Sequence, residues 1–292
     1  MSKPLVVVTG KNGQLGWELQ RLHEQYIQQF DFLFVDREEM DLGNLDSVSA
    51  FFHKYQPAYF INCGAYTAVD KAETEQELAY TINAASVGVI ASACKAIDAT
   101  LITISTDYVF NGKGTKPYAV DDATEPVNYY GYTKWLGEKL AKENNPKTIV
   151  IRTSWVYSSH GNNFVKTMLR LMKERQELKV VSDQVGSPTY AADLAEAIMQ
   201  VMLQQEAGNT QYGTYHFSNE GVISWFDFAV AIRDNAQLSC SVLPIPTEAY
   251  PTPAKRPAYS VLDKQAIVKD YSVVLKDWKP RLQQCLKELQ AI

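Results

Sequence analysis

Cysteine and histidine are scarce in this chain of 292 residues, and neither is clustered. The four cysteines stand apart, with no Cys-x-x-Cys pair and no close Cys/His spacing. Isolated thiols of this kind are typical of a reduced cytosolic protein and argue against a disulfide framework. The four histidines are equally scattered, so the sequence offers no zinc site, and we predict that the protein holds no metal.

Long hydrophobic runs and an excess of positive charge are also missing. No stretch reaches the roughly 18–20 consecutive apolar residues of a membrane helix, and a strand-like run at 5–9 leaves no room for a signal peptide. We therefore expect a cytoplasmic protein with no membrane partner. Lys and Arg number 28 against 33 Asp and Glu, and this mildly acidic balance argues against nucleic acid as a partner.

The first half of the sequence is a regular alternation of strand-like and helical segments. The run Leu5-Val6-Val7-Val8-Thr9 is typical of a strand that is covered on both faces. Strand–helix alternation predicts an α/β fold with a doubly wound parallel sheet of the Rossmann type. The expected strands are 5–9, 32–35, 59–61, 101–104 and 148–151, and the expected helices are 15–29, 45–55, 75–97 and 129–143.

The second half is less regular and predicts a smaller, discontinuous substrate lobe. Segments 181–188 and 244–257 are rich in Pro, Ser and Thr, as long functional loops often are. A helical pattern and then a strand-like pattern occupy the region near 190–218. We expect residues 1–155 to form a dinucleotide-binding domain and 156–292 to form mainly the substrate lobe, with the segments near 190–218 returning to the first domain.

A glycine-rich turn follows the first strand. Gly10, Gly13 and Gly16 are spaced so that the chain can turn tightly and bring backbone N–H groups against a pyrophosphate at the start of a helix. Asp36 lies twenty positions beyond the last of these glycines, where a carboxylate would accept hydrogen bonds from the adenosine ribose. The two features together predict a dinucleotide cofactor.

The choice between the two nicotinamide cofactors stays open at this point. Asp36 favours NADH because its carboxylate would repel the 2′-phosphate of NADPH. Arg37 follows directly and would pair with that phosphate. We therefore expect NADPH or NADH.

A tyrosine and a lysine four positions apart open one of the predicted helices. Tyr130 and Lys134 share one helical face, where the ammonium would stabilise the phenolate and lower a tyrosine pKa that is ordinarily near 10. The strand at 101–104 runs into Ser105 and Thr106 at the expected carboxyl edge of the sheet. The Thr106 hydroxyl can then hydrogen-bond a substrate oxygen beside Tyr130, which predicts proton transfer at that oxygen.

These residues stand within longer blocks that resemble the extended short-chain dehydrogenase/reductases, and among them the dTDP-4-dehydrorhamnose reductases. The resemblance extends nearly from end to end, and the blocks at 65–73 and 105–110 are far more specific than the glycines. The other blocks that carry it lie at 9–16, 152–157, 161–165, 183–189 and 256–257.

The resemblance implies a role for each matching position. Tyr130 would donate the proton, Lys134 would support it and anchor a cofactor ribose, and Thr106 would be the third catalytic group. A guanidinium fork suits a diphosphate, so Arg256 would hold that part of the substrate. The implied substrate-binding residues are Thr106, Asp107, Trp155 and Arg256, and the implied cofactor-binding residues are Gly10, Gly13, Gln14, Leu15, Gly16, Asp36, Asp41, Leu42, Ala65, Tyr66, Thr67, Tyr130 and Lys134.

The resemblance also implies a dTDP-sugar as the substrate. The expected reaction reduces the C4 keto group of dTDP-4-dehydro-6-deoxy-L-mannose to give dTDP-L-rhamnose, a precursor of cell-surface polysaccharide. A product with the 6-deoxytalose configuration stays open, because the face of hydride attack depends on the shape of the pocket. A sugar-nucleotide dehydratase is disfavoured, because Thr106 is followed by Asp107-Tyr108 and not by Asp-Glu.

Two further alternatives concern the class of protein and its assembly. A 4-epimerase retains the same Tyr/Lys pair, and a non-catalytic regulatory subunit resembling the β subunit of methionine adenosyltransferase would retain the same fold. Some members of the family are dimers bridged by magnesium on acidic residues, and Glu18 would match one ligand. The carboxylate spacing expected after Thr189 is not clearly reproduced, so we expect a monomer or homodimer without a structural metal.

Overall fold

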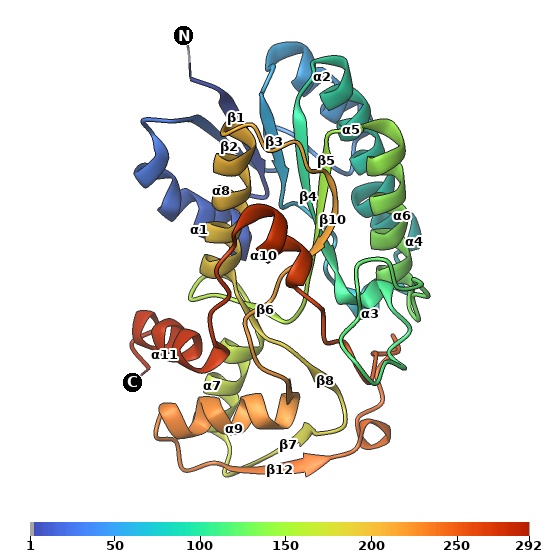
Figure 1. The fold of residues 1–292 in the computed structure, drawn as a ribbon. Coiled ribbons are helices and arrows are strands. Elements are labelled where there is room, and N and C mark those ends of the chain that lie inside the picture. The colour runs from blue at the N-terminus through green and yellow to red at the C-terminus, as the bar shows by residue number, and fades with distance from the viewer. Residues whose placement is uncertain (1–2, 292) are drawn as a thin grey trace.

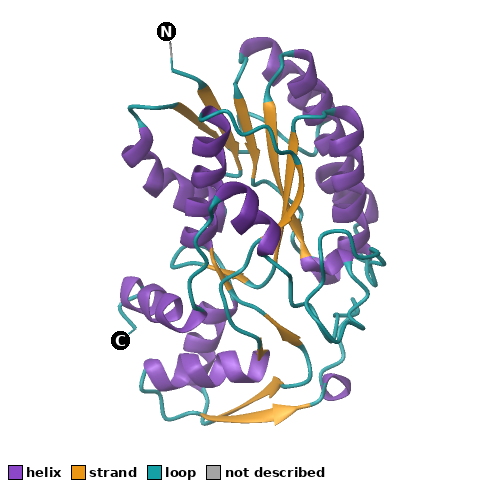
Figure 2. Ribbon diagram, in the orientation of Figure 1, coloured by secondary structure: helices purple, strands orange, loops and turns teal. Residues whose placement is uncertain are grey.

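A six-stranded parallel sheet lies at the centre of the protein (Figures 1 and 2). The computed structural model describes residues 3–291, so the outermost ends of the two predicted domains, residues 1–2 and 292, lie outside the described part. The strand order is β10-β5-β4-β3-β1-β2, and these strands pair in parallel, which confirms the predicted fold class. The strands are β1 (Leu5–Thr9), β2 (Asp31–Val35), β3 (Tyr59–Asn62), β4 (Thr100–Thr106), β5 (Thr148–Thr153) and β10 (Gly213–His216).

Helices cover both faces of this sheet. On one face, Leu19 and Ile198 share a core with Val8 of β1. On the other, Ile90 packs in a separate core with Val7 of the same strand. Successive side chains of a strand point to opposite faces, so the continuous apolar run at β1 needs both layers. The first layer contains α1 (Gln14–Leu22), α8 (Ala191–Glu206) and α10 (Gln265–Tyr271), and the second contains α2 (Leu45–Lys54), α5 (Ser86–Ala96) and α6 (Tyr129–Asn144).

Three segments from the second half of the chain contribute to this sheet and its layers. β10 extends the sheet by pairing with β5, and α8 packs beside α1. Helix α10 also packs here through Ile267 and Tyr271, although its segment was expected in the substrate lobe. The edge strand and much of one helical layer therefore come from residues far along the chain (Figure 1).

The helical run Gln76–Ala96 is long and apolar enough, by length and composition, to cross a membrane. It consists of α4 (Gln76–Tyr80), a π-helical turn (Thr81–Ala85) and α5. More than half of its apolar window, 56%, is buried inside the protein, where α5 packs against α2 and α6. The run is therefore a core helix of the sheet's second layer.

A smaller lobe lies beyond the carboxyl ends of the central strands (Figure 1). Its core joins Leu169, Phe228 and Leu282 from three helices to a two-stranded parallel ribbon. Segment 244–257, expected as a loop, begins inside the second strand of that ribbon. The elements are β6 (Val156–Tyr157), α7 (Phe164–Glu174), β7 (Glu177–Val181), β8 (Val185–Gly186), β9 (Thr189–Tyr190), β11 (Ile223–Ser224), α9 (Trp225–Asn235), β12 (Ser241–Ile245) and α11 (Trp278–Glu288).

Candidate active site

The glycine-rich turn lies where the strand order reverses, between β1 and β3. Open α/β sheets bind ligands at this point. Gly10 has a φ of +70°, which favours glycine, and a Cβ on Gly16 would lie 2.2 Å from the Gly10 carbonyl oxygen. This close packing of α1 on the turn directs the start of the helix at the crevice, and such a cradle fits the pyrophosphate of a dinucleotide.

A small pocket of about 160 Å³ opens beside the turn. Asp36 lies in it, accepts a hydrogen bond from Asn12 Nδ2 at 2.7 Å and has Lys11 Nζ 3.4 Å from its Oδ2. A hydrogen bond from the Glu38 backbone N–H, and then the ammonium of Lys11, help to lower the pKa of Asp36. The predicted cofactor residues that line this pocket are Gly10, Gly13, Asp36, Asp41, Leu42 and Ala65, and Arg37 lines it too.

The other predicted cofactor residues lie outside this pocket. The Leu15 side chain packs into the core, so only its backbone N–H is suited to meet a phosphate. The Gln14 side chain reaches the smaller lobe, where Asn163 Nδ2 donates to its Oε1 at 3.0 Å. Thr67 is exposed, and the Tyr66 hydroxyl donates to a carboxylate oxygen of Glu75 at 2.6 Å.

A buried asparagine fixes the backbone of the segment that carries Tyr66. Asn83 Oδ1 accepts from Tyr66 N at 2.9 Å, and its Nδ2 donates to Tyr66 O at 3.0 Å. The same Nδ2 donates to the Thr133 hydroxyl of α6 at 3.1 Å. Asn83 lies in the π-helical turn, which is a feature often found at functional sites. One side chain therefore connects the cofactor segment to the helix of the Tyr/Lys pair.

Tyr130 and Lys134 lie on the first turns of α6. Asn128 caps this helix by accepting from Gly131 N at 2.8 Å, and a Cβ on Gly131 would lie 2.2 Å from the Tyr108 carbonyl oxygen. The helix start therefore packs directly on the turn that follows β4. Lys134 is buried, and its Nζ donates to the carbonyl oxygen of Ile104 at 2.7 Å.

Burial governs the titration of the Tyr/Lys pair. It raises the pKa of Tyr130 to about 12, against the lowering effect of a hydrogen bond with Thr106. The spacing of Tyr130 and Lys134 predicts that the lysine lowers this pKa, but Lys134 is hydrogen-bonded to Ile104 and the effect of burial is larger. Burial also lowers the pKa of Lys134 to about 8. At neutral pH Tyr130 keeps the proton that an acid catalyst needs, and Lys134 stays charged.

Thr106 and Asp107 end β4 next to this pair. The Thr106 hydroxyl donates to Asp107 Oδ1 at 3.0 Å and accepts from Tyr108 N at 3.2 Å. Burial raises the pKa of Asp107 to about 6, although the nearby Ser260 and Thr106 hydroxyls oppose this. Asp107 Oδ2 is buried and has no hydrogen-bond partner among residues 3–291. An acceptor of this kind suits a substrate hydroxyl.

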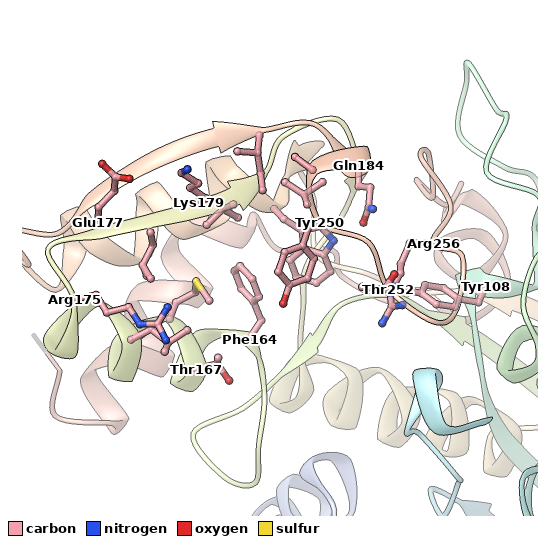
Figure 3. Close-up of a pocket in the computed structure, with 18 residues that line it drawn as sticks. Tyr108, Phe164, Thr167, Arg175, Glu177, Lys179, Gln184, Tyr250, Thr252 and Arg256 are labelled. Carbon is pink, nitrogen blue, oxygen red and sulfur yellow. The ribbon is translucent and has the colours of Figure 1, made fainter. Parts of the chain in front are cut away.

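A cavity of about 750 Å³ opens in the smaller lobe (Figure 3). Tyr108 and Arg256 line it at one end, and Arg175 and Lys179 lie at the other. Arg175 and Lys179 stand in no sequence motif, so no sequence signal marked them. A volume of this size is within the range of small-molecule sites. The cavity therefore extends from the turn after β4 into the smaller lobe.

Trp155 does not line this cavity directly. Its ring stacks on that of Trp225, with centroids 3.6 Å apart, and Trp225 does line the cavity. Trp155 has a φ of +49°, in the left-handed region that non-glycine residues seldom adopt. The backbone at Trp155 is therefore strained, and the same residue forms the stack with Trp225.

Arg256 is paired with a carboxylate. Its Nη1 lies 2.5 Å from Asp70 Oδ1 and its Nη2 lies 2.7 Å from Asp70 Oδ2. This guanidinium lowers the pKa of the Asp70 carboxyl. Asp70 lies on α3 (Val69–Ala72) of the sheet domain, so Arg256 joins that domain to the strap at 252–257. Arg256, the residue predicted to bind the substrate diphosphate, is thus already paired with the Asp70 carboxylate.

Glu18, the residue considered for a magnesium ligand, is also held by protein groups. Its Oε1 accepts from the Ser158 hydroxyl at 2.6 Å, and its Oε2 lies 3.2 Å from Arg21 Nη1. Within residues 3–291, no group of three or more His, Cys, Asp and Glu side chains is arranged to hold a metal ion.

Comparison with known proteins identifies the family. The RmlD substrate binding domain matches residues 4–291. The spore coat polysaccharide biosynthesis protein SpsK of Bacillus subtilis is 42% identical, and the dTDP-4-dehydrorhamnose reductase of Escherichia coli is 41% identical, with 97% of both chains covered in each case. The crystal structure of dTDP-4-dehydrorhamnose reductase from Bacillus anthracis in complex with NADP is 41% identical and has a TM-score of 0.90, covering 98% of this chain and 100% of that one. The chain belongs to the RmlD substrate binding domain family.

Proposed function

We propose that this protein is an oxidoreductase that reduces the C4 keto group of dTDP-4-dehydro-6-deoxy-L-mannose to give dTDP-L-rhamnose. The grouping of Tyr130, Lys134 and Thr106 at the end of β4, beside Tyr108 of the large cavity, carries this proposal. The relatives named dTDP-4-dehydrorhamnose reductase, at about 40% identity over nearly the whole chain, support it. The product would enter cell-surface polysaccharide synthesis.

The cofactor of this reaction is NADPH or NADH. Gln14 and Leu15 present backbone N–H groups to the pyrophosphate at the start of α1. Gly13 lies beside them with its own N–H donated to the Gly10 carbonyl oxygen, and Asp36 accepts from the adenosine ribose. When bound, the reduced nicotinamide supplies a hydride to C4 of the sugar. The NADP bound by the Bacillus anthracis reductase supports this choice of cofactor.

Three side chains take part in the transfer of a proton to the substrate oxygen. Tyr130 donates its hydroxyl proton to the oxygen on which negative charge develops. The Thr106 hydroxyl, which donates to Asp107 Oδ1 in the structure, turns to donate a hydrogen bond to the same oxygen. Lys134 supplies the positive charge that offsets the phenolate left on Tyr130. A positioned acid of this kind contributes roughly 10²–10⁴-fold to the rate.

The substrate lies along the large cavity. Asp107, whose buried Oδ2 has no partner among residues 3–291, accepts a hydrogen bond from a sugar hydroxyl, and Trp155 supports the cavity wall through its stack on Trp225. The diphosphate needs cations, and the cavity offers Arg256 at one end and Arg175 and Lys179 at the other. We assign residues 1–155 and the segments near 190–218 to cofactor binding, and the rest of 156–292 mainly to the substrate. We expect the enzyme to act in the cytoplasm as a monomer or homodimer, without nucleic acid or membrane partners.

Loss of absorbance at 340 nm tests the proposal, with freshly made dTDP-4-dehydro-6-deoxy-L-mannose and with NADPH and NADH in parallel. Rapid oxidation that yields dTDP-rhamnose is the expected result. The talose product would retain the chemistry and change the assigned stereochemistry. Cofactor binding without oxidation would overturn the proposal in favour of a regulatory subunit.

A further inference from the structure

A buried carboxylate lies one helical turn beyond Lys134. Glu138 is 3% exposed and follows Tyr130 and Lys134 on α6 at the same spacing of four residues. Residues four apart on a helix lie on one face, so the three side chains form a row. Burying a carboxylate is costly unless it is paired and hydrogen-bonded, so the partners of Glu138 indicate what it does.

Glu138 is held by groups from two neighbouring strands. Arg152 of β5, itself 3% exposed, donates from Nε to Oε1 at 2.9 Å and from Nη2 to Oε2 at 2.7 Å. Ser105 of β4 donates to Oε1 at 2.5 Å. Ser105 directly precedes Thr106, so this one carboxylate connects the helix of Tyr130 with the strand end of Thr106.

We propose that Glu138 is a positioning residue that holds α6 against β4 and places a negative charge one helical turn from Lys134. The inference concerns the site residues of the proposed reductase and rests on that function where turnover is measured. Glu138 contacts neither the cofactor pocket nor the large cavity, so it acts through Lys134 and the end of β4.

The surroundings of Lys134 leave few other sources of negative charge. Burial lowers the pKa of Lys134 to about 8, while the charge of Glu138 and then the nearness of Cys63 oppose this. Burial raises the pKa of the Cys63 thiol well above its ordinary range, so that group is neutral at physiological pH. The groups that face the Tyr/Lys pair are Glu138 and Thr106, the Cys63 thiol after β3, the Ile104 carbonyl of β4, and Asp107 beside Tyr130.

Arg152 offers a second variant, for which the opposite shift of the Lys134 pKa is expected. Glu138→Gln removes the negative charge and leaves the Arg152 guanidinium unpaired, so the pKa of Lys134 will fall. Arg152→Gln leaves the negative charge of Glu138 without its cation, so the pKa of Lys134 will rise. A mere loosening of the structure would move both variants in the same direction or neither, whereas the proposed role moves them in opposite directions.

The pH dependence of kcat/KM for the dTDP-sugar, at saturating NADPH, reports the groups of the enzyme before the sugar binds. The basic limb of this profile is the fall of kcat/KM at alkaline pH, which we attribute to loss of the Lys134 proton. In Glu138→Gln we expect the midpoint of the basic limb to shift to lower pH by about one unit, so that kcat/KM at pH 9 falls about tenfold further than in the wild type. In Arg152→Gln we expect the limb to move up. Unmoved limbs, or shifts of the same sign, would overturn the proposal.

Asp193→Asn is the matched control. Asp193 is also a 3% exposed carboxylate paired with basic groups, Arg281 Nε at 2.8 Å and Lys276 Nζ at 3.1 Å, but it lies on α8 away from the Tyr/Lys pair. We expect this variant to lose thermal stability and to keep the basic limb of the wild type. If it shifts the limb as Glu138→Gln does, the effect is one of general loosening and the proposal fails.

A second readout does not depend on turnover. In protein labelled with ¹³C at the lysine ε carbon, the Lys134 signal is the one missing from Lys134→Arg, and its titration gives the pKa of Lys134 directly. We expect that midpoint to fall in Glu138→Gln and to rise in Arg152→Gln, and an unchanged midpoint in both overturns the proposal. Where Glu138→Gln does not fold, Arg152→Gln carries the test alone with the opposite sign. A wild type that reduces no dTDP-sugar would refute the proposed function, and the lysine signal would still decide the role of Glu138.

Discussion

Arg256 and Asp70 form a two-pronged ion pair although 186 positions separate them in the chain. Asp70 also accepts a hydrogen bond from Ala254 N at 3.1 Å, so it holds both the backbone and the side chain of the strap that carries Arg256. Any diphosphate that binds to this guanidinium has to compete with the Asp70 carboxylate. The pair therefore sets how readily Arg256 is available to a substrate.

We expect Asp70→Asn to lower the KM for the dTDP-sugar, because the neutral amide releases the guanidinium, and Arg256→Gln to raise it about tenfold. Steady-state kinetics at saturating NADPH measure both effects. Arg170→Gln is the control, because this residue forms an exposed pair with Glu174 on α7 and does not line the cavity. A rise in KM in Asp70→Asn as large as that in Arg256→Gln would mean that the pair only holds the strap in place.

Tyr130→Phe removes the proton donor and little else. We expect kcat to fall by about 10²–10⁴-fold, because only the hydroxyl is lost from the reacting oxygen, while the Kd for NADPH stays within a factor of about three. Fluorescence titration with NADPH and stopped-flow absorbance at 340 nm give the two values. Tyr132→Phe, two residues along on the exposed side of the same helix, should leave both unchanged. Normal turnover in Tyr130→Phe would contradict the assignment.

Asp107 makes the stability of the protein depend on pH. Burial raises its pKa to about 6 in the folded protein, from an ordinary value near 4. The folded state therefore holds this proton more tightly than the unfolded chain does. The stability that this contributes is fully present below pH 4 and is lost as the pH rises through 6. Asp107→Asn stays neutral, and we expect it to be more stable than the wild type by about 3 kcal/mol at pH 8 and by about half as much at pH 5. Urea unfolding at the two pH values measures this gain. Equal stability of the two proteins at pH 8 would rule out a buried ionised Asp107, and Asp31→Asn, at an exposed site, should show no pH-dependent gain.

Two glycines where α6 meets the Gln76–Ala96 run should respond oppositely to alanine. A Cβ on Gly137 would lie 2.1 Å from the Asn83 carbonyl oxygen, so we expect Gly137→Ala to destabilise the protein by about 1–3 kcal/mol and to weaken NADPH binding through Asn83. A Cβ on Gly88 would lie 3.4 Å from Leu140 Cβ, an ordinary contact, so Gly88→Ala should gain up to about 1 kcal/mol from helix propensity. Thermal unfolding separates the two cases. Similar changes in both variants would show that the Asn83 contact is not tight.

The features of the candidate site that follow from the sequence alone are local ones. Gly10, Gly13 and Gly16 act within one turn, and Tyr130 and Lys134 within one helical turn, so spacing alone brings their backbones together. The strand pattern was equally informative, because a strand buried on both faces has to be apolar at every position.

Contacts between distant segments could not be predicted in this way. The Arg256–Asp70 and Arg152–Glu138 pairs join different elements, and no pattern in the sequence marks them. The pKa of Tyr130 was predicted in the wrong direction, because desolvation depends on how α6 packs on Tyr108 and not on the position of Lys134 alone. Strand β12 was missed because Pro244 lies within it, and proline is tolerated in such a strand only at an edge or bulge.

The return of α8 and β10 to the sheet has a consequence for how the chain folds during synthesis. Leu194 and Ile198 of α8 cover the face of the sheet formed in part by Val6 and Val8, so in a nascent chain that ends near residue 155 only α1 covers that face. The first strands must therefore wait, at about 5–20 residues per second, for some fifty further residues before their core can close. A fragment that ends at 155 should aggregate, and the two halves should rescue each other only when they are produced together.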